Sequence, residues 1–244
     1  MRVGSVIDRA FDTLRREWRI AVLIGAATVG GIVFFFIAAF GFFGLSIGFD
    51  ATVPEDVDVA RLAIGGIVFF LLAVAYSLVL YVLNGISVRA AYHGPPEGTP
   101  WDGLGSHAGP ALWGSLRILG WSLILGVVVA VVFGGLAVVG GVLADDGGGL
   151  FAFLFVVLMI GFVLASLFVL PVVLVAVALV YAQERPVLAA LGDGFRLVGR
   201  AYWPSLGAAL LLFVFSLVPI VGGLLVTVLA PPYQASLLIE LESA

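Results

Sequence analysis

The chain has 244 residues, of which 63% are hydrophobic and only 11% are charged. A soluble domain is about half apolar and about one quarter charged, so this composition excludes that class and predicts an all-α integral membrane protein with one domain over residues 1–244. Cysteine is absent, which excludes disulfides and thiolate chemistry. The net charge is −4, and no basic patch is interleaved with aromatics on a soluble face, so we expect no nucleic-acid partner.

The first predicted element is an amphipathic helix over residues 3–19. Apolar residues recur on one face with helical spacing, among them Val3, Val6, Phe11 and Trp18, and arginines occupy the other face. This pattern is typical of a helix that lies on the headgroups of a bilayer. The alternative is a charged extension of the first span. The long apolar run that follows predicts a retained span rather than a cleaved signal peptide.

Long apolar runs predict six transmembrane helices arranged as three hairpins, since a helix needs about 20 residues to cross a bilayer. The approximate spans are residues 20–48, 62–83, 116–143, 150–180, 205–218 and 222–240. Pro171 should kink or interrupt the fourth span. The last pair is ambiguous: Pro204–Ala230 is long enough for one tilted span, but the turn-like segment 218–223 favours two.

Between the second and third spans, residues 84–113 form the longest polar stretch. Its later part, from Trp101 onward, is weakly amphipathic, and Pro110 should interrupt it. Its ionisable side chains include His93, Asp102 and His107. These three residues match no metal-binding spacing, and we interpret them as solvated loop residues.

A second interfacial helix is predicted over residues 186–203. Its apolar residues cover about one quadrant of a helix and are Val187, Leu188, Leu191, Phe195, Val198 and Tyr202. Asp193, Arg196 and Arg200 fall on the opposite face. Pro186 suits the first turn, where its missing N–H costs nothing. We expect the apolar quadrant to face the bilayer.

The arginine distribution predicts the orientation. All 11 basic residues are arginine. With the N-terminus inside, the inner segments hold Arg2, Arg9, Arg15, Arg16, Arg19, Arg89, Arg117, Arg185, Arg196 and Arg200. The outer segments hold Arg61 alone, and they are acidic. The positive-inside rule therefore places both termini in the cytoplasm of a multi-pass protein of the cell membrane.

Arginines and aromatic residues gather where the inner segments enter the spans. The candidate contacts with lipid headgroups are Arg16, Trp18, Arg19, Trp113, Arg117, Arg196, Arg200, Tyr202 and Trp203. Aromatic rings favour the headgroup level, and arginines attract anionic lipid. The bilayer, including anionic lipid, is thus the first expected partner.

Within the spans, small residues recur every four positions. They are Gly126, Ala130 and Gly134 in the third span and Gly161 and Ala165 in the fourth. Such stripes let helices approach closely. We favour tight packing within the chain, with a seam between two copies as the alternative, and the oligomeric state stays open.

Two C-terminal segments carry a family resemblance. QERPVLAALGDGFRLVGRAYWPSL (residues 183–206) and VPIVGGLLVTVLAPPYQASLLIELE (residues 218–242) resemble a pattern of prokaryotic six-span membrane proteins. That group is similar to the membrane domain attached to some glycerophosphoryl diester phosphodiesterases and to related domains of unknown function. The family's usual arginine near the end is replaced by Glu240 and Glu242. The resemblance implies a six-helix domain but not the phosphodiesterase, because the chain has no room for its soluble barrel.

Ionisable residues inside a bilayer are the usual signal of function, and the middle of every predicted span lacks them. We therefore expect no catalytic, cofactor or metal site. The leading hypothesis is a non-enzymatic membrane module that organises lipid or a membrane partner protein. The alternatives are a transporter for a lipid-like or apolar solute and a membrane enzyme acting on headgroups through His93, Asp102 or His107.

Overall fold

Long helices make up the computed structural model, which describes residues 3–47, 59–94, 100–216 and 221–243. This part of the chain contains no strand. The helices are α1 (Val3–Arg16), α2 (Trp18–Ile47), α3 (Val59–His93), α4 (Pro100–Ala182), α5 (Val187–Arg200), α6 (Tyr202–Ser216) and α7 (Val221–Glu242).

Five helical stretches of the described residues are long and apolar enough to cross a membrane: Trp18–Gly41, Ala63–His93, Gly105–Leu136, Phe155–Ala182 and Gly223–Glu242. A sixth is counted if α5 and α6 together form one span, although the two are bent by 110°. The fold is thus compatible with a multi-pass membrane protein, as its composition predicts.

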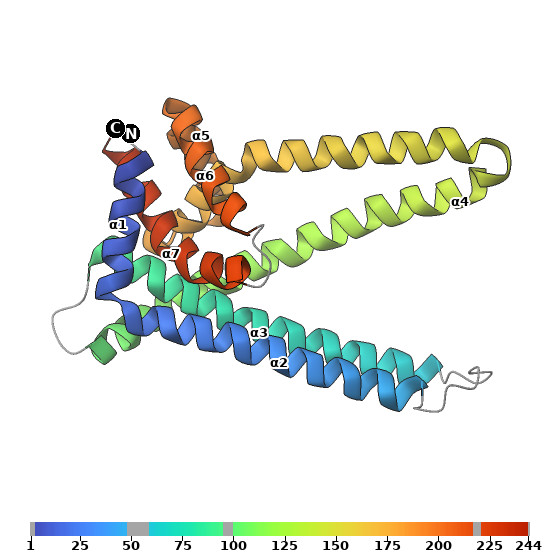
Figure 1. Ribbon diagram of the computed structural model, residues 1–244, viewed down its shortest axis with the longest axis horizontal. Coiled ribbons are helices and arrows are strands. Elements are labelled where there is room, and N and C mark those ends of the chain that lie inside the picture. Colours follow the sequence, from blue (N-terminus) through green and yellow to red (C-terminus); the bar gives the residue numbers. More distant parts are fainter. Residues whose placement is uncertain (1–2, 48–58, 95–99, 217–220, 244) are drawn as a thin grey trace.

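Two long hairpins project from a common body (Figure 1). One consists of α2 and α3. The other is α4 alone, which turns back at its far end so that its two arms run in opposite directions. The body contains α1, α5, α6 and α7, and the two chain termini lie side by side there.

The C-terminal helix α7 is the centre of the body, because it packs against each of the other six helices. Its side chains Leu237, Leu238 and Leu241 are almost fully buried. The hydroxyl of Tyr233 donates a hydrogen bond of 2.8 Å to Ala208 O of α6. The last apolar stretch of the sequence therefore supplies the core of the fold and not a peripheral span.

The inner segment between the second and third predicted spans differs from the prediction. Helix α3 continues ten residues beyond the predicted end at residue 83, and α4 begins at Pro100, so most of residues 84–113 is helical rather than loop. Pro110 lies inside α4 and does not end it. The interruption predicted there is wrong. Pro171 also lies inside α4, where it is buried.

Both predicted amphipathic helices exist, and each begins close to its predicted start. Helix α1 ends at Arg16 and not at residue 19, since Trp18 already belongs to α2. Helix α5 follows Pro186 and ends at Arg200. At the C-terminal end α6 ends at Ser216 and α7 begins at Val221, which lies inside the predicted turn 218–223; residues 218–220 of that turn lie outside the described part of the chain.

The apolar quadrant of α5, which we expected to face the bilayer, is divided between the protein surface and the protein core. Ala190, Gly194 and Val198 face the protein core, whereas Leu188 and Phe195 are exposed. A Cβ atom at Gly194 would lie 3.1 Å from Val172 O of α4, so only a small residue permits this approach. The sequence pattern did not mark Ala190 and Gly194 as buried, because it weighs hydrophobicity and these small residues are buried by the close approach of α4.

Candidate functional site at the end of α4

Polar side chains from several helices gather at the end of α4. Helix α4 ends at Ala182, and Glu184 follows with a left-handed backbone (φ 56°). That conformation commonly stops a helix, but it is unfavourable for a residue with a Cβ atom. Neighbouring side chains hold the segment in place.

Three cationic or imidazole side chains supply hydrogen bonds to the carbonyl groups at this helix end. Arg89 Nη1 donates to Tyr181 O at 2.8 Å, and His93 Nε2 donates to Ala182 O at 2.9 Å. Arg117 Nη1 donates to Glu184 O at 2.8 Å. The last carbonyls of a helix lack partners within it and carry partial negative charge. Donors from α3 and from the first arm of α4 therefore fasten the second arm.

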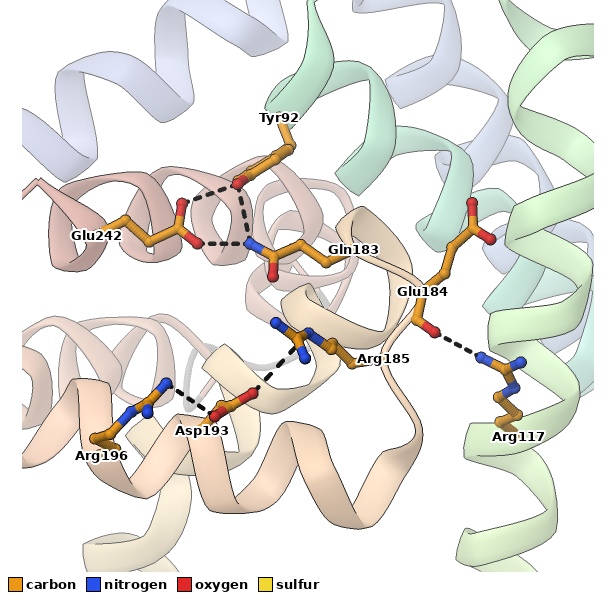
Figure 2. Close-up of polar contacts among 8 residues, drawn as sticks. All are labelled: Tyr92, Arg117, Gln183, Glu184, Arg185, Asp193, Arg196 and Glu242. Atoms are coloured by element: carbon orange, nitrogen blue, oxygen red, sulfur yellow. Dashed lines mark hydrogen bonds and ion pairs between the residues drawn. The ribbon is translucent and has the colours of Figure 1, made fainter.

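The same segment is tied to α7 (Figure 2). Gln183 Nε2 donates to Glu242 Oε1 at 2.6 Å and to the Tyr92 hydroxyl at 3.1 Å. That hydroxyl donates in turn to Glu242 Oε2 at 2.9 Å. Three helices, α3, α4 and α7, thus meet through one closed set of hydrogen bonds.

Below this polar layer the ring of Tyr181 is buried between α3 and the first arm of α4. Its hydroxyl donates to Tyr81 O at 2.9 Å and lies 3.3 Å from Ser115 Oγ. Added Cβ atoms at Gly85 and Gly114 would lie 2.6 and 2.8 Å from Tyr181 Cδ1. Two glycines therefore make room for the ring. The amino-acid composition alone does not show which glycines have this role.

Helix α5 carries its own charged surface beside this layer (Figure 2). Asp193 accepts a hydrogen bond of 3.0 Å from Arg196 Nη2, and its other carboxylate oxygen lies 4.0 Å from Arg185 Nε. The side chains of Arg185 and Arg196 are mainly exposed. Asp193 and Arg196 are three positions apart, a spacing at which side chains on a helix are neighbours.

An apolar groove with a volume of about 310 Å³ opens between the two arms of α4 and α5. Two stripes with i, i+3, i+4, i+7 spacing face each other across it, and two α5 residues complete the lining. The lining residues are Ile118, Trp121, Ser122, Leu125, Val173, Ala176, Val177, Val180, Val187 and Leu191.

Arginines stand next to the polar end of this groove. Arg117 precedes the lining residue Ile118, and Arg185 lies two positions before the lining residue Val187. A narrow apolar groove with cations near one end matches the chemistry of an anionic amphiphile. Its volume is at the lower end of the range for ligand pockets, about 300 to 1,000 Å³.

The structure does not gather the predicted headgroup contacts at one place. Trp113 and Trp203 are 65% and 74% exposed. Arg19 stacks over Trp18, with its Cζ 5.7 Å from the ring centroid. The other predicted contacts lie on α1, α4, α5 and α6 and are Arg16, Arg117, Arg196, Arg200 and Tyr202.

The predicted small-residue stripes are open in the structure. Added Cβ atoms at Gly126, Gly134 and Gly161 would meet no atom within 4 Å among the described residues, and Ala130 and Ala165 are exposed. Tight packing within the chain, which we favoured for these five positions, is therefore not what the fold does with them. Close approach falls instead on other glycines: Gly31 against Tyr76, Gly85 and Gly114 against Tyr181, and Gly194 against Val172.

The histidines of the inner segment face each other as stacked rings, with the centroids of His93 and His107 6.4 Å apart. The described residues contain no group of three or more His, Asp or Glu side chains able to hold a metal. Within the described part, buried His107 Nε2 and Arg89 Nε have no hydrogen-bond partner.

Sequence reasoning missed the residues that build this site, above all Arg89, Tyr92, Tyr181 and Glu242. One available signal was the polar run Gln183–Arg185, which directly follows an apolar span. The other was the position of Arg89 and Arg117 at the inner ends of two further apolar spans. Nothing in the spacing showed that these segments meet.

The fold defines the class of protein: the chain is all-helical, and its described residues contain five or six helices able to span a membrane. Comparisons with protein-family models, with curated proteins and with solved structures find no match to the chain. The resemblance to the membrane domain of glycerophosphoryl diester phosphodiesterases therefore stays a prediction.

Proposed function

We propose that the chain is a multi-pass protein of the cell membrane that acts as a non-enzymatic module and binds anionic lipid at its cytoplasmic surface. Its six spans form three hairpins, with α6 as a short span and α1 and α5 as interfacial helices. The adjacent termini support an even number of crossings. The arginines at the inner segments support the orientation.

The observation that carries the lipid proposal is the groove between α4 and α5. Its lining is hydrocarbon apart from the Ser122 hydroxyl and the Trp121 indole N–H, so it suits an acyl chain. Arg117 and Arg185 lie near its inner end, where a phosphate group would stand. Each stripe covers eight residues, a rise of about 10 Å along the helix, which is the length of part of one acyl chain.

The test measures lipid retained by the purified chain in native mass spectrometry. The unmodified protein should retain phospholipid with a preference for phosphatidylglycerol over phosphatidylcholine. Val177→Trp fills the groove and should reduce the retained lipid, whereas Val163→Trp, on an exposed part of the same arm outside the groove, should not. Arg185→Gln should reduce the anionic preference. A wild-type protein without retained lipid would contradict the proposal.

A transporter of a lipid-like solute is the second candidate. The observation that favours it is a further apolar groove of about 560 Å³ between the arms of α4, lined by residues such as Val132, Phe133, Leu158 and Phe162. Together the two grooves follow much of the length of the arms. Reconstituted protein should then accelerate exchange of a fluorescent phospholipid between leaflets, and exchange at the rate of protein-free vesicles would exclude this role.

An organising role toward a membrane partner protein is the third proposal, supported by the open small-residue stripes. Crosslinking from a cysteine placed at Ala130 should capture a neighbouring protein or a second copy. A chain that stays monomeric and uncrosslinked in its native membrane would argue against it.

A further inference from the structure

A separate pocket of about 450 Å³ lies at the junction of α1 and α2 and shares no lining residue with the grooves of α4. Its lining combines charged and aromatic side chains of the α1–α2 elbow with aliphatic side chains of α2 and α7. The residues that matter are Phe11, Asp12, Arg15, Trp18, Val22 and Val228.

Asp12 and Arg15 place one negative and one positive charge on the same wall. They are three positions apart on α1, which separates their Cβ atoms by about 5 to 6 Å. Neither forms a salt bridge within the described residues. The charged wall is therefore neutral overall, unlike the arginine-rich inner surface around it.

The pocket is held in shape by the packing of α1 on α7. Val6 and Ala10 are buried in the core, and Arg9 Nη2 lies 3.4 Å from Glu240 Oε1. The helix that carries Asp12 and Arg15 is thus fixed relative to Val228. A ligand binding here would not have to order the wall first, which lowers the entropic cost of binding.

We propose that this pocket binds a zwitterionic phospholipid whose headgroup carries a primary ammonium. The phosphate pairs with Arg15, the ammonium donates hydrogen bonds to the Asp12 carboxylate, and one acyl chain lies against Val22 and Val228. Phe11 and Trp18 flank the headgroup at the depth where aromatic rings are favoured.

The charges select among headgroups. An anionic headgroup would meet the Asp12 carboxylate, and like charges at a binding site are unfavourable. A quaternary ammonium has no N–H to donate to that carboxylate, whereas a primary ammonium has three. Phosphatidylethanolamine therefore fits both charges, and phosphatidylcholine and phosphatidylglycerol each fit one.

The experiment titrates the full chain in detergent with these three lipids, matched in acyl chains, and reads the bound fraction by native mass spectrometry. With the groove of α4 filled by Val177→Trp, the protein should bind phosphatidylethanolamine most tightly. Asp12→Asn should weaken that binding about tenfold, to the level of phosphatidylcholine, because one charged hydrogen bond is lost. Arg15→Gln should weaken all three lipids.

Matched controls separate the pocket from general surface charge. Asp8→Asn makes the same charge change as Asp12→Asn on α1 outside the pocket and should leave the preference intact. Ala21→Trp fills the pocket and should abolish the preference without changing a charge. An unchanged unfolding temperature for each variant shows that the fold is retained.

In the Val177→Trp variant, whose α4 groove is filled, equal binding of phosphatidylethanolamine and phosphatidylcholine would overturn the inference. A preference of that variant for phosphatidylglycerol that Asp12→Asn does not alter would overturn it as well. The site goes beyond the proposed function. In the Val177→Trp variant the groove of α4 is filled but this pocket is intact, so the two proposals fail separately.

Discussion

Gly85 of α3 and Tyr181 of α4 are in such close contact that the tyrosine ring occupies the space of a side chain at position 85. A Cβ atom there would lie 2.6 Å from Tyr181 Cδ1. The ring cannot move away freely, because its hydroxyl is bonded to Tyr81 O and because the ring also lies against Gly114, where an added Cβ atom would be 2.8 Å from Tyr181 Cδ1. This contact locks the second arm of α4 onto the α2–α3 hairpin.

Gly85→Ala should therefore destabilise the fold. Replacing glycine by alanine in an unobstructed helix stabilises the helix by about 0.5 to 1 kcal/mol. At position 85 the added methyl group overpacks the contact with Tyr181, and we expect the free energy of unfolding to fall by about 1 to 3 kcal/mol instead. Thermal unfolding in detergent measures the change. Gly66→Ala on the same helix, where an added Cβ meets no described atom within 4 Å, should be neutral or stabilising. Equal effects at both positions would contradict the assigned contact.

Arg89→Met should destabilise the end of α4. The Arg89 side chain is 11% exposed, and its loss leaves Tyr181 O without this donor. A hydrogen bond from a charged group to such a carbonyl contributes about 1.5 to 3 kcal/mol. The control is Arg196→Gln, whose side chain is 69% exposed and whose ion pair with Asp193 should contribute less than about 1 kcal/mol. Chemical denaturation of both variants gives the comparison.

Shortening a leucine on the core face of α7 should reduce the free energy of unfolding more than shortening one on its exposed face. Leu238→Ala removes a side chain that is 0% exposed in the centre of the body, and the expected loss in the free energy of unfolding is about 2 to 5 kcal/mol. Leu225→Ala on the same helix removes a side chain that is 46% exposed and should cost far less. A small effect of Leu238→Ala would show that α7 is a peripheral span after all.

The proposed orientation can be tested with single cysteines, since the chain contains none. Ser243→Cys should resist a membrane-impermeant thiol reagent in intact cells, because the C-terminus is proposed to be cytoplasmic. Asp145→Cys, at the acidic far end of α4, should react. Labelling is read by a mass shift on a gel, and opened cells show that the first cysteine is reactive. The reverse pattern would overturn the positive-inside argument for this chain.

Local features of the fold were readable from local sequence. The spacing of apolar residues predicted α1 and α5, and Pro186 marked the start of α5. The prediction missed the length of α3, because Asn84, Arg89 and His93 read as a polar loop. In the fold Asn84 and Arg89 face other helices and not water, and the exposed His93 is bonded to the end of α4, so polarity alone misjudged them.

Composition and periodicity determined that the chain is all-helical, where most of its helices begin, and that its long helices can cross a membrane. These properties depend on neighbouring residues and on the apolar surface of each segment. Only the tertiary structure decided that α7 is the core, that Gly85 and Gly114 form a slot, and that Arg89 and Arg117 fasten the end of α4. The physical reason is distance along the chain: Arg89 and Tyr181 are 92 positions apart, and hydrogen bonds between such segments depend on how the helices cross.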